Sequence, residues 1–430
     1  MRAFSRALAS VVDVGRDLLA RRRLAATQSD AASVALADLC HALLEHRGEA
    51  SGLALASEIT SSYLTLSSED RETFFQSLLT DFGVNREQIL EAAKNYSDKP
   101  DHKNLAAVAK AVEAPRQKLF RRINMAPDGT RTLVTLRGQL LQAKRHNSAL
   151  AAVDADLRHL FISWFNKGFL EMQRISWETP AATLEKIIAY EAVHAINGWD
   201  DLRNRLKHDR SCFAFFHPAM PGDPLVFVEV AFTDELPGAI APLLEQEREP
   251  LGADKADTVV FYSISNCHPG LAGVSFGNFL IKQVVEEVRQ EHPNIKTFVT
   301  LSPVPAFRKW LETARVEELI EPHLADAVKE PVNTVVPAEV RDALMKLCAH
   351  YLLNEKSRGL AKDPVARFHL GNGARLHRLH WAADLSTKGK QQSAGIMVNY
   401  LYDLDKIEIN HEEYFDQGQI AVSKTISKLL

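Results

Sequence analysis

The sequence has few cysteines, no long apolar run and no excess of basic residues. Its four cysteines among 430 residues form no CxxC pair, which argues against a structural zinc site and is typical of a reducing compartment. No apolar run reaches the roughly 20 residues needed to cross a bilayer, so we expect no membrane span. The formal net charge of −4 gives no indication of nucleic-acid binding.

Several motifs that carry well-known chemistry are also missing. The sequence contains no GxGxxG dinucleotide fingerprint, no P-loop and no HExxH zinc motif, and the candidate serine Ser302 does not lie in a GxSxG nucleophile elbow. The motifs therefore do not indicate a binding site for a dinucleotide, an NTP or a catalytic zinc ion. We expect no metal site.

The distribution of apolar residues predicts two domains, one helical and one that contains strands. Apolar residues recur at helical spacing through residues 1–165 without a β-rich run, which predicts an all-helical bundle domain. Strand-like runs begin after Gly168, and residues 166–430 form the second predicted domain. The arginine-rich N-terminus could be a mitochondrial transit peptide or the first helix of the fold; Asp13 and Asp17 favour the helix, because transit peptides are poor in acids.

The most informative stretch covers residues 257–312. An apolar strand, residues 258–264, is followed by a loop with glycines, then by a helix-spaced segment and a second strand, residues 297–301. A glycine loop at a helix start can hold a pyrophosphate, although a tight turn with close packing explains the glycines equally well. The preceding strand, residues 225–232, suggests an antiparallel neighbour, so the sheet is predicted to be mixed and the fold α+β, in the manner of acetyltransferase-like (GNAT) folds that hold coenzyme A.

Two residues stand out as candidate catalytic groups, each with a simpler explanation. Ser302 lies just past the second strand, where catalytic groups collect, but Ser-Pro is also a typical helix start. His369 lies in an ordered-looking loop, where a core histidine is the default unless another group pairs with it. His377 and His380 are three residues apart in a predicted strand, so they point to opposite faces, and we expect packing or surface roles.

Two polar residues in the apolar segment 394–404 are further candidates. Asn399 could donate to an oxyanion and Tyr402 could act as an acid or hydrogen-bond donor. The pattern alone favours interior polar groups satisfied by the backbone.

Taken together, these stretches resemble the malonyl-CoA decarboxylase family. The resemblance is dense from about Glu191 to Tyr402 and weaker over the helical region. The matching motifs include Phe261–Ser265, Gly273–Val274, Leu301–Pro305, Phe368–Leu370, Asn372–Ala374 and Asn399–Tyr402.

The resemblance implies a helical domain used in oligomerisation, as a tetramer built from two dimers, and a GNAT-type catalytic domain. It implies that Ser302 and His369 are the catalytic pair and that Tyr402 is an active-site tyrosine. The implied substrate-binding residues are Ala272, Gly273, Val274, Ser275, Phe276, Gly277 and Asn278 of the coenzyme A stretch, together with Asn399. There is one departure, because family members carry GVELG where this chain has GVSFG, so Ser275 replaces a glutamate.

The expected activity is conversion of malonyl-CoA to acetyl-CoA and CO2 through a thioester enolate that is protonated at C2. It uses no metal, PLP or biotin, and coenzyme A enters as part of the substrate. The alternatives are a CoA-dependent acyltransferase on the same fold and a non-catalytic CoA-thioester-binding protein. We expect a cytoplasmic, bacterial protein rather than one of the mitochondrial matrix, with a role in malonate or fatty-acid metabolism.

Overall fold

The structure is a computed structural model that describes residues 32–252, 255–274, 279–332 and 335–430. The arginine-rich N-terminal segment and Ser275, Phe276, Gly277 and Asn278 lie outside these residues. The described chain divides into two compact units. The first comprises residues 32–171, 216–223 and 268–274, and the second comprises residues 172–215, 224–252, 255–267, 279–332 and 335–430. Two segments that follow strand-like runs in the sequence therefore pack in the helical unit.

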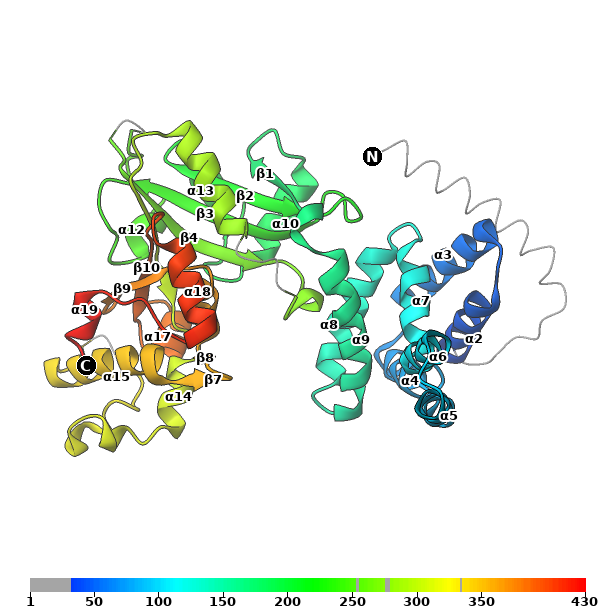
Figure 1. Cartoon of the computed structure of the whole chain (residues 1–430). Coiled ribbons are helices and arrows are strands. Elements are labelled where there is room, and N and C mark those ends of the chain that lie inside the picture. The colour runs from blue at the N-terminus through cyan, green and yellow to red at the C-terminus, as the bar shows by residue number, and fades with distance from the viewer. Residues whose placement is uncertain (1–31, 253–254, 275–278, 333–334) are drawn as a thin grey trace. The chain divides into compact units, whose positions relative to one another are not determined.

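The first unit is helical, as the spacing of its apolar residues predicts. Side-chain caps fix several helix starts: Ser67 accepts from the Asp70 N–H, and Asn85 and Asp101 do the same for the next two helices. Its helices, coloured blue to green in Figure 1, are α2 (Ala32–Glu45), α3 (Glu49–Thr65), α4 (Ser68–Thr80), α5 (Arg86–Asp98), α6 (His102–Val112), α7 (Pro115–Asn124), α8 (Gly129–Ala143) and α9 (Ala151–Trp164). Among the described residues, no helix of the chain is long and apolar enough to span a membrane.

The second unit is built on a mixed sheet with strand order β1-β2-β3-β4-β5-β10-β6, and β9 also pairs with β10. β3 and β4 are antiparallel, β4 and β5 are parallel, and β10 is antiparallel to β5, β6 and β9. The predicted α+β class with a mixed sheet is confirmed. The strands are β1 (Glu171–Ile175), β2 (Arg210–Phe216), β3 (Pro224–Thr233), β4 (Thr258–Asn266), β5 (Thr297–Thr300), β6 (Ser302–Pro303), β9 (Arg375–His380) and β10 (Met397–Tyr402), with β7 (Lys356–Ser357) and β8 (Leu360–Ala361) as a separate pair.

Helices join these strands and cover the sheet. Helix α13 (Phe279–Glu291) connects β4 to β5, which completes the predicted βαβ unit. On one face of the sheet, Val260, Val299 and Met397 pack with Leu243 of α12 (Ala241–Leu244). The remaining helices are α10 (Ala181–Tyr190), α11 (Trp199–Arg205), α14 (Phe307–Thr313), α15 (Ala338–Asn354), α16 (Pro364–Gly371), α17 (Thr387–Ser393), α18 (Ile407–Gln417) and α19 (Lys424–Ser427).

The parallel pairing of β4 and β5 is short and ends just before the predicted catalytic serine. The two strands pair from Thr258↔Thr297 to Phe261↔Thr300. β4 then continues to Asn266, whereas the chain after β5 turns to β10 through β6. Pairing between β4 and the chain that follows β5 therefore ends at Thr300, two residues before Ser302.

Candidate active site

Ser302 is the first residue of β6, so it stands where the parallel pairing has just ended. Its Cα partner is Val398 of β10, and its side chain is buried. The helix-start interpretation of Ser302 is wrong, because α14 begins at Phe307, after Ala306. The serine is held by a sheet rather than by a helix end.

His369 lies in helix α16 rather than in a loop, so that prediction is wrong. The Asp363 carboxylate accepts from the N–H groups of Val365 at 2.9 Å and Ala366 at 3.0 Å, which caps the helix, and Pro364 occupies its first turn. The imidazole is buried and stacks on Tyr400, with ring centres 4.7 Å apart and an angle of 23° between the ring planes. Helix and strand therefore fix the ring together.

A chain of hydrogen bonds joins the three predicted catalytic residues. His369 Nε2 lies 3.1 Å from Ser302 Oγ, and His369 Nδ1 lies 2.8 Å from Tyr402 Oη. Ser302 Oγ donates to Thr300 Oγ1 at 3.0 Å, and Thr300 Oγ1 also accepts from the Tyr400 N–H at 3.1 Å. With the Ser302 hydroxyl donating to Thr300, the histidine tautomer that satisfies both ring contacts carries its proton on Nε2, which donates to Ser302 Oγ, while Nδ1 accepts from Tyr402.

Burial keeps this chain uncharged. It lowers the pKa of His369 from 6.5 to about 3 and raises the pKa of Tyr402 well above its usual value. Both groups are therefore neutral near pH 7, with one ring N–H available on the histidine. The neutral His369 imidazole can therefore donate a proton to a reacting group without first carrying a positive charge.

The depressed pKa of His369 predicts acid sensitivity of the fold. Between pH 6.5 and about 3 the unfolded chain binds a proton that the folded site excludes, so this contribution to stability is complete above pH 6.5 and is lost as the pH falls. From about pH 7.5 to 5.5 the free energy of unfolding should drop by about 1.4 kcal/mol from this residue. Urea titrations of the wild type and of His369→Asn, whose amide does not titrate, measure the difference; equal pH dependence in both would contradict it.

Asn399 lies on β10 with its amide engaged by other groups. Its Nδ2 donates to the Thr300 carbonyl at 2.8 Å, and its Oδ1 lies 2.6 Å from His380 Nε2. The side chain is fully buried. This arrangement anchors the end of β5, from which Ser302 follows, rather than directing the amide toward the Ser302–His369 pair.

The described part of the glycine stretch lies in the helical unit. Residues Pro269–Leu271 form a short 3₁₀ helix, η4, that packs on α8. Ala272 and Gly273 are exposed and Val274 is buried. Gly273 has φ of +72°, a conformation that a side chain disfavours, so this turn favours glycine.

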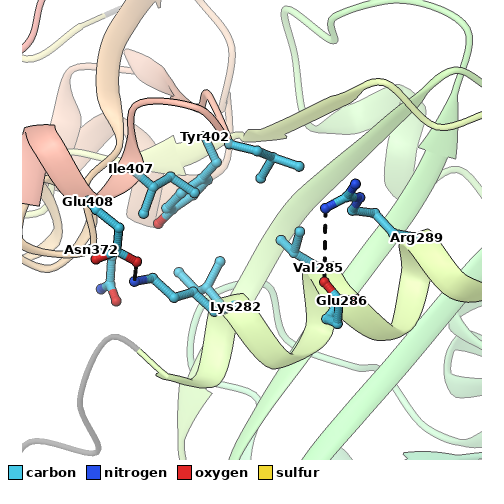
Figure 2. Close-up of a pocket in the computed structure, with 10 residues that line it drawn as sticks. Lys282, Val285, Glu286, Arg289, Asn372, Tyr402, Ile407 and Glu408 are labelled. Carbon is cyan, nitrogen blue, oxygen red and sulfur yellow. Dashed lines mark hydrogen bonds and ion pairs between the residues drawn. The ribbon is translucent and has the colours of Figure 1, made fainter.

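A pocket of about 210 Å³ has Tyr402 among its lining residues (Figure 2). Helix α13 forms one wall with Ile281 and Val285, and Asn372 follows the helix that carries His369. The lining includes two ion pairs, Lys282–Glu408 and Glu286–Arg289. Tyr402 thus links the pocket to His369.

Sequence reasoning missed two residues that complete the site. Thr300 Oγ1 accepts a hydrogen bond from the Ser302 hydroxyl, and the Tyr400 ring stacks on the His369 ring. The signal for Thr300 was present, because it lies two residues before Ser302 and therefore on the same face of an extended chain. Tyr400 could not be distinguished from a core tyrosine by pattern.

The fold and the site define a class: an α+β protein with a buried, uncharged Ser–His–Tyr chain of hydrogen bonds at the end of a parallel strand pair in a mixed sheet. Comparison with known proteins points to one family. The family model for the malonyl-CoA decarboxylase C-terminal domain matches residues 168–430, and the model for the N-terminal domain of the same family matches residues 82–165. The chain belongs to the malonyl-CoA decarboxylase family.

Individual relatives agree with this assignment. The mitochondrial malonyl-CoA decarboxylase of Anser anser anser is 34% identical, over 81% of this chain and 77% of the relative. The crystal structure of malonyl-CoA decarboxylase from Rhodopseudomonas palustris is 47% identical with a TM-score of 0.87, covering 92% of this chain and 99% of that one. The enzyme from Agrobacterium vitis is 46% identical with a TM-score of 0.84, over 92% of this chain and 99% of that one.

Proposed function

We propose that this chain decarboxylates malonyl-CoA to acetyl-CoA and CO2, with Ser302 and His369 as the reacting pair. The observation that carries the proposal is the buried hydrogen-bonded chain Ser302–His369–Tyr402 in a member of this family. It makes the protein a carboxy-lyase. No metal, PLP or biotin takes part, and coenzyme A belongs to the substrate.

Loss of CO2 leaves the enolate of acetyl-CoA, and this sets the requirements on the site. The malonyl carboxylate must lie out of the plane of the thioester carbonyl, so that the breaking C–C bond overlaps the π system. The developing enolate oxygen needs donors that are already in place. In this proposal the Ser302 hydroxyl, oriented by Thr300 and His369, turns its proton from Thr300 to the malonyl carboxylate when the substrate binds, and so holds the carboxylate in this geometry.

The enolate carbon must then receive a proton, and His369 is the donor in this proposal. The carbon is a stronger base than an imidazole nitrogen, so the neutral Nε2–H can be transferred to C2. The Tyr402 hydroxyl proton moves to Nδ1 at the same time, which leaves the ring neutral. When the product has left, Nε2 takes up a proton from solvent and Nδ1 returns its proton to Tyr402, which restores the starting tautomer, so one proton enters for each CO2 released.

Tyr402→Phe should therefore slow turnover without removing binding. The substitution deletes the hydroxyl 2.8 Å from Nδ1 and keeps the ring. A hydrogen bond of this kind in a polarised site corresponds to about a ten-fold effect on kcat, with little change in KM. Steady-state kinetics with malonyl-CoA measures both constants. An unchanged kcat would remove Tyr402 from the proton path.

The substrate-binding part of the proposal assigns coenzyme A to residues 272–278 and the acyl end to the pocket next to Tyr402. A GNAT-type catalytic domain is the corresponding fold. Two features support it: β4 and β5 part after four paired residues, and the β3–β4 register shifts next to the parting, between Glu229 and Val230. Such a shift bends a strand and increases its twist, which helps to open the sheet for a thioester.

We also propose a homotetramer, a dimer of dimers, that assembles through the helical domain in the cytoplasm. Exposed apolar side chains on α5 and α6, namely Leu90, Leu105 and Val112, support self-association. Light scattering after size exclusion tests the mass. The solved relatives from Rhodopseudomonas and Agrobacterium favour a bacterial location and a role in malonate or fatty-acid metabolism.

One assay separates this function from its two rivals. The purified chain is incubated with malonyl-CoA, and the products are followed by mass spectrometry and CO2 release. Acetyl-CoA and CO2 in equal amounts support decarboxylation. Acyl transfer to an added amine without CO2 would indicate an acyltransferase, and binding without turnover would indicate a non-catalytic protein.

A further inference from the structure

Residues 268–271 form the turn that precedes the residues assigned to coenzyme A. A buried arginine of the helical unit holds this turn by a hydrogen bond. Arg137 of α8 is almost completely buried, and its Nη1 donates to the Gly270 carbonyl at 2.6 Å. Its Nε donates to the Asp154 carboxylate of α9 at 2.8 Å. Lys144 also binds Asp154. The guanidinium therefore bridges two helices and one backbone carbonyl of the turn.

The acid in this bridge is held in its charged form. Burial alone would raise the pKa of the Asp154 carboxyl, but hydrogen bonds from Lys144 and Arg137 lower it. Asp154 therefore stays ionised near neutral pH and keeps Arg137 aimed at Gly270.

Backbone contact adds to this attachment. A Cβ built on Gly270 would lie 1.8 Å from the Val134 carbonyl oxygen, a distance that no side chain tolerates, so the turn touches α8 directly. Gly138 faces it, with its own Cβ position 3.3 Å from Gly270 N. Three residues further along the turn, Arg158 Nε of α9 donates to the Gly273 carbonyl at 3.2 Å. Two arginines thus fix two carbonyls of residues 270–274.

We propose that Arg137, assisted by Arg158, is a positioning residue for coenzyme A that acts through the carbonyls of Gly270 and Gly273. The inference rests on the proposed function, because it takes residues 272–274 as part of the coenzyme A stretch. A fixed Gly270 carbonyl fixes the orientation of the peptide units that follow it. Without that attachment the turn has to be ordered by the ligand, which weakens binding.

The test compares two arginines of the same chemistry in the full-length protein. Arg137→Ala removes the attachment, and Arg116→Ala is the matched control. Arg116 is also buried, pairs with Asp156 at 2.6 Å and donates to a backbone carbonyl, but that carbonyl belongs to Leu78, away from the turn. Arg137→Lys and the exposed Arg158→Gln serve if Arg137→Ala does not fold.

Binding of acetyl-CoA is measured by calorimetry and turnover of malonyl-CoA by steady-state kinetics. We expect Arg137→Ala to raise Kd and KM at least ten-fold, equivalent to about 1.4 kcal/mol, with kcat within about three-fold of wild type. Arg116→Ala should lower the melting temperature and leave Kd unchanged. Arg137→Lys and Arg158→Gln should raise Kd less.

Two results would overturn the inference: an unchanged Kd in the folded Arg137 and Arg158 variants, or an equal rise in Kd for Arg116→Ala, which would indicate general destabilisation. The binding measurement does not depend on catalysis. A wild type that binds acetyl-CoA without decarboxylating malonyl-CoA would therefore refute the proposed function while leaving this inference testable.

Discussion

Replacing His369 by asparagine is expected to lower kcat for malonyl-CoA by about 10²–10⁴-fold, the range for losing a positioned general acid. Asparagine can still accept from Tyr402, but it carries no ring nitrogen at the Nε2 position, 3.1 Å from Ser302 Oγ. The enolate would then have to wait for a proton from water. KM should change by no more than about three-fold, because the loss falls on the transition state.

A matched histidine variant controls for the loss of a partly buried imidazole. His377 lies on β9, has a pKa lowered mainly by burial, and is not part of the hydrogen-bonded chain described above. His377→Asn should keep kcat near the wild-type value. Near-normal turnover in His369→Asn would exclude His369 as the proton donor.

Ser302→Ala is expected to lower kcat by about 10²–10³-fold, the effect of removing one preorganised donor from a reacting centre. The substitution deletes the hydroxyl that lies between Thr300 Oγ1 and His369 Nε2. The malonyl carboxylate would lose its fixed angle to the thioester, and the imidazole would lose one of its two anchors. kcat should therefore fall more than KM rises.

The double variant Ser302→Ala with His369→Asn tests whether the two residues act as one unit. Groups that act together show strongly non-additive losses. We expect the double variant to be about as slow as the slower single variant. Losses that multiply would show that the two residues act independently, and a single variant with unchanged kcat would exclude that residue.

The sequence predicts the parts of this molecule that depend on local periodicity. The helices of the first unit follow from apolar spacing and from capping residues such as Ser67 and Asp101. The strands around residues 225–232 and 258–264 follow from continuous apolar runs. Residues 363–381 read as a loop followed by a strand. The strand is present, but residues 364–371 are helical, and Asp363-Pro364 is the helix-start signal that indicates this.

The site depends on contacts that no spacing encodes. Ser302 and His369 are 67 residues apart, and they meet because β10 pairs with β6 and places Tyr400 and Tyr402 beside the helix that carries the histidine. Their roles were predicted from family resemblance and not from pattern. Likewise, the attachment of Gly270 to Arg137 joins segments 133 residues apart, and in the sequence Gly270 is only one of several glycines in a loop.

The most direct test of the central claim is decarboxylation of malonyl-CoA in D2O, with the acetyl-CoA analysed by mass spectrometry. An enolate protonated at C2 by a group that exchanges with solvent takes up one deuterium for each CO2 released. We predict singly deuterated acetyl-CoA for the wild type at full rate, and a rate lowered by about 10²–10⁴-fold for His369→Asn. Absence of CO2 release, or acetyl-CoA formed at the wild-type rate by His369→Asn, would contradict the proposed mechanism.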